Sequence, residues 1–241
     1  MKASLLTGVS ASALLLVGSA QAADMAAHPV YKAQPVAPVW SWTGFYVGGT
    51  LGGVWSRNTV GDDPTATNPF LGTFGLTGID NNSAGVIGGL EAGYNWQLAN
   101  WVLGIEADIS FSSLNHSTVG AAATTDVYQS RLDWLSTVRG RVGYAFDRWL
   151  VYGTGGAAVA DLKDTYTSPP LGFVAAPSAT TWGWTAGGGV EYAVADHWTV
   201  KAEYLHVGFP NRTVDNLSAF GYGLVFKDRL DIARVGINYK F

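Results

Sequence analysis

The chain has 241 residues, no cysteine and a formal net charge of −4, and only 13% of its residues are charged whereas 48% are hydrophobic. A soluble domain usually carries about twice that charged fraction, and the mild acidic balance argues against nucleic-acid binding, which favours a basic face. Because cysteine is absent, the disulfide frameworks that hold many small exported domains together are excluded.

The first 22 residues predict a secretory signal peptide. One lysine is followed by the apolar run ALLLVG, and the segment ends in the small-x-small pattern of Ala20 and Ala22, which predicts cleavage after Ala22. A membrane anchor is the weaker alternative, because the apolar run is too short to span a bilayer. Residues 23–41 contain several prolines and no periodicity, and they predict a mobile periplasmic leader. The remaining residues, 42–241, predict one barrel domain.

The stretch 101–111 gives the clearest strand signal in the chain. If it is a strand, Trp101 and Ile105 share one face with the other apolar residues, while Glu106 and Asp108 share the opposite face. On a helix, the two carboxylates would lie about 200° apart and would interrupt any apolar face. The stretch therefore predicts a strand with one apolar side and one polar side.

Eight such strands are predicted in chain order. They span residues 42–57, 83–96, 101–115, 128–146, 149–162, 181–194, 198–209 and 227–241. Three short turns alternate with four longer loops, as in bacterial outer-membrane barrels, which have an even number of strands and short periplasmic turns. The stretch 70–79 could add a hairpin and raise the number to ten, although its glycine spacing makes a poor membrane strand.

Aromatic residues gather at both ends of the predicted strands. The predicted girdle residues are Trp96, Trp101, Trp149, Trp198 and Tyr239 near the short turns, and Trp134, Trp182 and Trp184 near the long loops. Ten residue steps from Trp101 to Phe111 correspond to about 33 Å of strand, or about 25 Å along the barrel axis at a tilt of about 40°. That height matches the apolar band of outer-membrane barrels. The pattern predicts an all-β, eight-stranded antiparallel transmembrane β-barrel, whereas a soluble lipocalin-like barrel would need a polar outside.

The other face of the predicted strands carries charges of both signs. The residues predicted to point into the lumen are Glu91, Glu106, Asp108, Asp133, Arg139, Arg141, Glu191, Lys201, Glu203 and Arg234. Eight strands enclose a space that side chains can fill, and arginine forks suit paired contacts with carboxylates. The sequence thus predicts a lumen plugged by ion pairs. The faces of the glycine-rich strands 42–57 and 149–162 stay unassigned.

Several stretches together resemble a known family of small outer-membrane barrels. WTGFYVGGTLGGVWS, GGLEAGYNWQ, LSTVRGRVGYAFDRWLVYGTGGAA and the terminal RVGINYKF are similar to the alphaproteobacterial 25/31-kilodalton major outer-membrane protein family, also described as a porin family or an OmpA-like β-barrel domain. The resemblance covers essentially the whole chain after the signal peptide. It implies an abundant protein of the Gram-negative cell envelope, located in the outer membrane, that contacts lipopolysaccharide and peptidoglycan-linked components. The final Phe241 resembles the signal read by the barrel-insertion machinery.

Two non-enzymatic functions fit a barrel of this kind. The leading hypothesis is a structural and interaction barrel that contributes to envelope integrity, with outer-membrane lipids, lipopolysaccharide and the barrel-insertion machinery as partners. The alternative is a narrow diffusion porin, against which the small width of eight strands argues.

Enzymatic and ligand-binding functions have weaker support in the sequence. His116 lies near several serines at a predicted loop edge, but no spacing pairs a nucleophile with a base and an orienting acid, so no catalytic residue is predicted. Tyr204 and His206, with the loop residues Phe209, Phe220 and Tyr222, could form a heme pocket. They equally fit an interfacial aromatic belt. No cofactor or metal is expected, and host or hemin ligands at the outer loops stay open.

Overall fold

The computed structural model describes residues 40–73, 75, 77–119, 127–169, 173–176, 178–214 and 221–241. The chain divides into two units, Met1–Pro38 and Val39–Phe241, and every described residue belongs to the second. The predicted signal peptide and nearly all of the predicted leader therefore lie outside the described residues. Within the described residues, no helix has the length and hydropathy that crossing a membrane requires.

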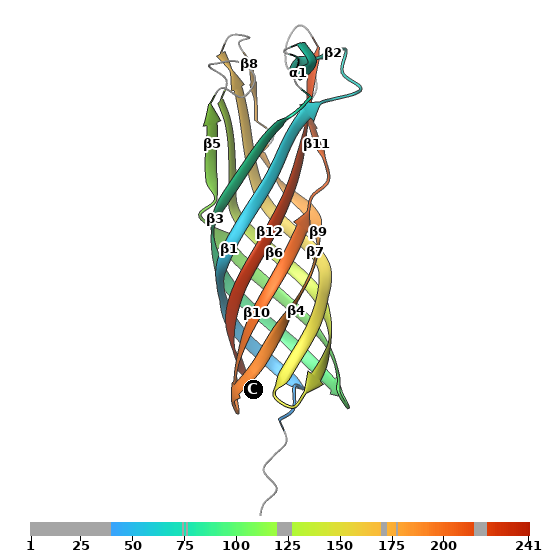
Figure 1. Ribbon diagram of the computed structural model, residues 1–241, viewed down its shortest axis with the longest axis vertical. Helices are drawn as coiled ribbons and strands as arrows, with labels where there is room; N and C mark the ends of the chain where they lie inside the picture. The colour runs from blue at the N-terminus through green and yellow to red at the C-terminus, as the bar shows by residue number, and fades with distance from the viewer. Residues whose placement is uncertain are drawn as a thin grey trace, which may run out of the picture. The chain divides into compact units, whose positions relative to one another are not determined.

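Eight long strands of the described chain form a closed ring (Figure 1). They are β1 (Gly44–Asp62), β3 (Ile79–Leu98), β4 (Trp101–Ser112), β6 (Val127–Phe146), β7 (Trp149–Ser168), β9 (Ser178–Ala195), β10 (Trp198–Gly208) and β12 (Tyr222–Lys240). Each strand pairs antiparallel with the next, and β12 returns to pair with β1 from Tyr46 opposite Lys240 to Asp62 opposite Leu224. Closure satisfies the backbone groups that an open sheet edge would leave unpaired. The predicted eight-stranded antiparallel barrel is confirmed.

The shorter elements lie at the loop end of the barrel (Figure 1). They are β2 (Asn68–Pro69), α1 (Phe70–Thr73), β5 (Asn115–Val119), β8 (Phe173–Ala175) and β11 (Arg212–Val214). The Asp62 carboxylate accepts hydrogen bonds from the backbone N–H groups of Leu71 at 2.7 Å and Gly72 at 2.9 Å, which stabilises the short helical turn α1. In the described part of 70–79, this turn takes the place of the alternative hairpin.

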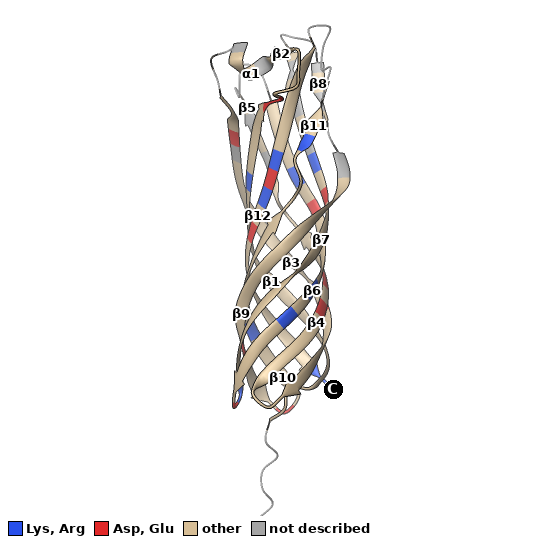
Figure 2. Cartoon of the chain, turned by 90° about the vertical axis from the view of Figure 1, so that its right-hand side faces the viewer, with Lys and Arg blue, Asp and Glu red and all other residues tan. Residues whose placement is uncertain are grey.

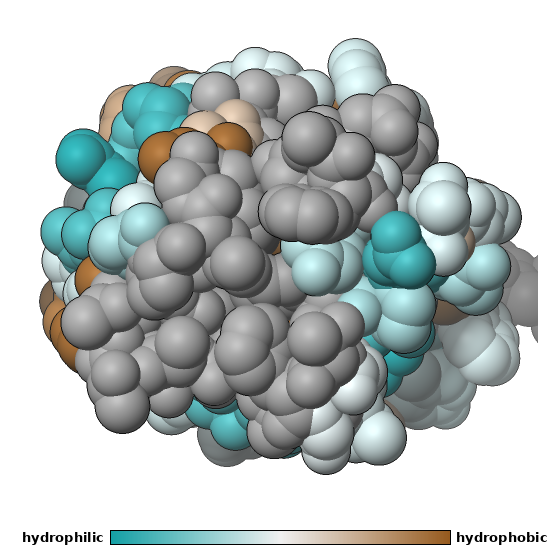
Figure 3. Space-filling view, turned by 90° about the horizontal axis from the view of Figure 1, so that it is seen from above, coloured by the Kyte–Doolittle hydropathy of each residue, from teal (hydrophilic) through white to brown (hydrophobic). Residues whose placement is uncertain are grey.

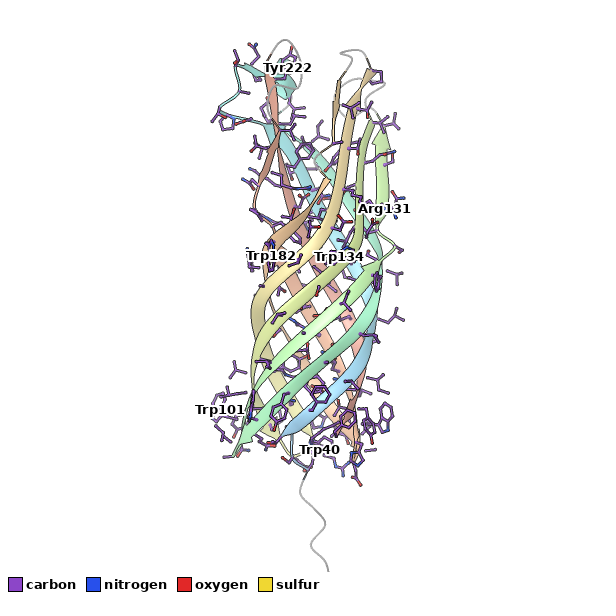
Figure 4. The ribbon with its side chains drawn as sticks, turned by 180° about the vertical axis from the view of Figure 1, so that it is seen from behind. Trp40, Trp101, Arg131, Trp134, Trp182 and Tyr222 are labelled. Atoms are coloured by element: carbon purple, nitrogen blue, oxygen red, sulfur yellow. The ribbon has the colours of Figure 1, made fainter. Side chains whose placement is uncertain are left out.

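The three short turns lie where the sequence predicts them, but the opposite strand ends extend further than expected. β1 continues to Asp62 instead of ending near residue 57, and β3 already begins at Ile79. The added residues of these two strands are rich in Asn and Asp, which a sequence pattern assigns to loops. In the barrel their backbone groups pair between strands, and inward side chains such as Asn58 and Ser130 hydrogen-bond to each other at 2.6 Å. The wall therefore continues well above Trp134 and Trp182 (Figure 4).

Side chains alternate between lumen and exterior along each long strand. On β4, for example, Ile105 is 57% exposed on the outside while its neighbour Glu106 is 3% exposed inside. The structure also assigns the two strands whose faces the sequence left open. Tyr46 and Val54 of β1 and Tyr152 of β7 are buried in the lumen, whereas the odd-numbered Leu51 of β1 lies outside.

Candidate functional site

Arg139 lies at the centre of a set of buried charges in the lower half of the lumen. Its guanidinium contacts the carboxylates of Glu106, Asp108 and Glu203, the last at 3.1 Å. The pair with Glu106 follows from register, because the two residues lie directly opposite each other on β4 and β6. The contact with Glu203 comes from β10, on another part of the ring. Only closure of the barrel brings this third carboxylate to Arg139.

The remaining cations extend this set across the lumen. Arg234 donates to Glu203 at 2.9 Å and to Asp108 at 3.0 Å, joining β12 to β10 and β4. Lys201 lies 2.7 Å from Glu91 and 3.1 Å from Glu106. Arg234 and Glu203 lie opposite each other on the paired strands β12 and β10, but the other contacts link strands that are not neighbours, so the charges tie the barrel together through its interior.

Arg141 is held between two tyrosines. It donates to Glu191 at 2.6 Å and to the Tyr46 hydroxyl at 3.0 Å, and its guanidinium lies 4.1 Å from the ring centre of Tyr152. Glycine makes room for the first ring, because a Cβ on Gly93 would come within 2.4 Å of the Tyr46 hydroxyl. Sequence reasoning missed both tyrosines, since they lie on the two glycine-rich strands.

We call these nine groups the lumenal charge network. Its members are Glu91, Glu106, Asp108, Arg139, Arg141, Glu191, Lys201, Glu203 and Arg234, all 5% exposed or less. The structure thus brings together nine of the ten residues predicted to point inward. Five carboxylates face four cations, and such pairing is what makes burial of charge tolerable in a barrel interior.

Asp133, the tenth residue predicted to point inward, does not belong to the network, so that prediction is wrong. It lies on the outside, where it pairs with Arg131 and with Lys163, the latter at 2.6 Å. The cause is an irregularity in the pairing of β6 with β7 between Leu132 and Leu135, both of which are buried in the lumen. A bulge adds one residue to the strand and changes which face the following side chains occupy. Alternation counted from Arg139 cannot detect this shift.

Apolar layers lie on both sides of the lumenal charge network. Toward the loops, a buried cluster includes Val54, Ile87, Leu135, Leu205, Leu230 and Ile232. Toward the short turns, a second cluster contains Trp42, Val102, Ala145, Leu150, Tyr152 and Ala193. Trp42 is 1% exposed, and its backbone N–H donates to the Gln97 side chain at 2.7 Å. The sequence placed Trp42 at the first strand start but did not indicate that it closes the lumen.

The predicted girdle residues form two belts on the outside. Near the short turns, the exposed Trp96, Trp101, Trp149 and Trp198 are joined by the half-buried Tyr239. Near the loops, Trp182 and Trp184 are exposed and Trp134 is half-buried. Figure 4 shows Trp101 near the lower end of the barrel and Trp134 and Trp182 at a common higher level. Phe241 is exposed at the lower belt, with its ring 5.6 Å from that of Phe45. Its role as an insertion signal stays a prediction.

Among the described residues considered for heme binding, Tyr204 and His206 share a partner on the outside of the barrel, whereas Phe209 does not join them. His206 points outward, with Nδ1 at 2.7 Å from Asp231, and Tyr204 donates to the same carboxylate at 2.6 Å. Phe209 instead belongs to the apolar cluster inside the lumen. Phe220 and the side chain of His116 lie outside the described residues. Among the described residues, no group of three or more His, Cys, Asp or Glu side chains is arranged to hold a metal ion.

Similarity to known proteins extends over the whole chain. A family model described as "Outer membrane protein beta-barrel domain" matches residues 10–241. The 31 kDa outer-membrane immunogenic protein of Brucella melitensis biotype 1 is 37% identical over 256 residues, with 100% of both chains covered. The 22 kDa outer membrane protein of Rhizobium leguminosarum bv. viciae is 31% identical, over 86% of this chain and 82% of that protein. The crystal structure of OprG from Pseudomonas aeruginosa has a similar fold, with a TM-score of 0.52, 12% identity, and 85% of this chain and 100% of that chain covered.

Proposed function

Because the chain belongs to the outer-membrane β-barrel protein family and is located in the cell outer membrane, we propose that it is a non-enzymatic barrel with a sealed lumen. In this proposal it contributes to envelope integrity through its contacts with outer-membrane lipids, including lipopolysaccharide, and it interacts with its surroundings through its loop end. The C-terminal end of the chain, with Phe241, engages the barrel-insertion machinery during assembly.

The main support for a sealed lumen is that the lumenal charge network lies between two buried apolar layers. A diffusion pore needs a continuous polar path, and an ion crossing either layer would lose its hydration without gaining a partner. Inside the network, each cation already has carboxylate partners within the barrel. Both features favour a structural barrel over a porin.

Conductance in a planar bilayer tests the proposal. The wild-type protein is expected to give no steady steps of the size produced by 16- to 18-stranded porins. A control variant, Leu205→Ser, removes a fully buried apolar side chain from the upper layer. We expect it to raise background leak without producing regular steps. Regular porin-sized steps from the wild-type protein would rule out a sealed lumen.

The envelope role needs a separate experiment in the cell. The loop-end rim is mostly hydrophilic among the described residues, with isolated hydrophobic ones between (Figure 3), as suits a surface in contact with water. Deletion of the gene is expected to increase sensitivity to detergent, and the wild-type gene should restore resistance. If Arg139→Ala protein that reaches the membrane at normal level restores resistance equally well, the network does not matter for that role.

A further inference from the structure

Three cations gather on the outer surface of β1 and β12, just above the upper aromatic belt. Arg57, Lys227 and Arg229 are all exposed, and we call them the β1–β12 basic patch. In the register of the two strands, Arg57 lies opposite Arg229, and Lys227 lies opposite Thr59. Figure 2 shows a blue, red and blue band on the upper part of β12; its red part is the inward Asp228.

The height of the patch places it at lipid headgroups. The exposed Trp55 of β1 belongs to the upper aromatic belt, because Asp231 lies opposite both Trp55 and His206, and the His206 ring is 5.4 Å from that of Trp184. Arg57 lies two residues beyond Trp55 on the same strand, a step of about 5 Å along the barrel axis. Lys227 lies about 5 Å further toward the loops. Indole rings in such belts sit at the boundary between acyl chains and headgroups. The three cations are therefore at the level where lipid phosphates lie.

The protein itself leaves these charges largely uncompensated. Like charges directly opposite each other on paired strands are destabilising, and Arg57 and Arg229 are such a pair. Among the described residues, the ion-pair partner of Arg57 is Asp231 at 3.5 Å, whose other oxygen already accepts from Tyr204 and contacts His206. Within the described part of the chain, no carboxylate forms an ion pair with Lys227 or Arg229. An external anion at this position would relieve the repulsion.

A second cluster at a similar height behaves differently and makes a natural control. Arg131 and Lys163, on β6 and β7, are paired with Asp133, and Lys163 is also 3.3 Å from Asp161. Two cations and two carboxylates balance each other in this cluster. Position above the belt alone therefore does not produce an unpaired basic surface.

A crevice adjoins the patch and indicates what kind of lipid it suits. Its volume is about 570 Å³, and its lining includes Trp55, Arg57, Asn82, Ala84, Tyr204 and Asp231. The indole ring of Trp55 offers a flat apolar face. The Asn82 amide, the Tyr204 hydroxyl and the Asp231 carboxylate offer hydrogen bonds. Such a combination suits a hydroxyl-rich sugar better than the small headgroup of a phosphodiester lipid.

We propose that the β1–β12 basic patch and this crevice bind the phosphorylated sugar headgroup of an outer-leaflet glycolipid. Guanidinium groups pair with phosphate oxygens in a forked geometry, while the sugar occupies the crevice and the acyl chains run down the apolar surface below Trp55. The inference rests on the contact with outer-membrane lipids proposed above and adds the place on the barrel where the phosphorylated glycolipid binds.

Native mass spectrometry of the folded protein in neutral detergent tests this site. The probe is diphosphorylated lipid A, compared with dephosphorylated lipid A and with phosphatidylglycerol. The variant Arg57→Gln/Lys227→Gln/Arg229→Gln is expected to bind the diphosphorylated form at least about tenfold more weakly, because charge-assisted hydrogen bonds are lost. The matched control Arg131→Gln/Lys163→Gln should bind as the wild-type protein does.

Equal binding by the wild-type and triple variants, or an equal loss in the control, would overturn the site. Binding of phosphatidylglycerol as tight as that of lipid A would overturn the preference for a sugar headgroup. If the triple variant folds poorly, Arg229→Gln alone removes the like-charge pair, should fold at least as well as the wild-type protein, and should still weaken binding. Porin-sized conductance would overturn the sealed lumen without affecting this result.

Discussion

The barrel carries two clusters of acidic and basic side chains that share their chemistry and differ in their surroundings. In the lumenal charge network, the Arg139 side chain has no exposed surface. In the exterior cluster, the Arg131 side chain is 59% exposed. Removing one partner of a buried pair typically costs about 3–5 kcal/mol, whereas an exposed pair contributes about 0–1 kcal/mol. Burial, and not the number of contacts, therefore decides how much an ion pair contributes to the stability of this barrel.

The largest effect is expected from the centre of the network. Arg139→Ala should lower the free energy of unfolding by about 3–5 kcal/mol, because three carboxylates lose a cation that is buried with them. Adding Glu106→Ala should restore part of the loss. The measurement is a double-mutant cycle on urea unfolding in lipid vesicles. Arg131→Ala is the control and should cost no more than about 1 kcal/mol. Additive losses for Arg139 and Glu106 would mean that the two are not coupled.

A charge placed on the outer surface tests the same difference between sites removed from water and sites exposed to it. Ile105→Arg puts a cation near the middle of the apolar band, where it should cost about 2–4 kcal/mol. Val119→Arg, at an exposed position on β5 above the belt, should have almost no effect. The folding yield in lipid vesicles and the free energy of unfolding in urea are measured for both variants. Equal folding of the Ile105 and Val119 variants would show that the membrane lies elsewhere on the barrel.

Two tyrosines allow a smaller and closely matched comparison. Tyr46 donates to Glu106 at 2.7 Å in the lumen, and Tyr204 donates to Asp231 at 2.6 Å on the outside. Tyr46→Phe should cost about 1–3 kcal/mol, since it leaves buried charged groups without a partner. Tyr204→Phe should cost less, because water can replace the hydroxyl at an exposed site. A larger loss for Tyr204→Phe in the same unfolding assay would contradict the role assigned to burial.

Salt gives the smallest expected effect. At about 1 M salt the screening length falls to about 3 Å for exposed charges, while buried pairs are screened much less. The coupling energy between Arg131 and Asp133 should therefore fall toward zero between low and high salt. The coupling between Arg139 and Glu106 should hardly change. Double-mutant cycles at both salt concentrations measure this, and a lumenal coupling that disappears in high salt would show that water and ions enter the lumen.

Much of the fold could be predicted because a membrane barrel repeats a local rule. Alternation along 101–111 indicated a strand and assigned Glu106 and Asp108 to its inner face, and the position of Trp101 marked the lower belt. The short turns were located as well, since Asp147, which adopts a left-handed φ of 55°, is a typical turn residue. The family assignment, the strand number and the outer-membrane location were confirmed.

Other features depended on the closed barrel. The outward position of Asp133 follows from a bulge, which changes the face of a side chain without an unmistakable mark in the sequence. The upper parts of β1 and β3 are strands because their polar residues find partners on neighbouring strands. The inward faces of Tyr46 and Tyr152 could not be assigned among so many glycines, which give no alternation to count.

By itself the sequence determined where the eight strands and the short turns lie and which face most of the strand residues present, because side-chain direction along a strand has a period of two residues. Only the tertiary structure decided which charges meet: Arg234 and Asp108 are 126 residues apart and lie 3.0 Å from each other across the lumen. It also placed Arg57 beside Arg229. Such contacts depend on how eight tilted strands are staggered when the ring closes, and that stagger is a property of the whole barrel.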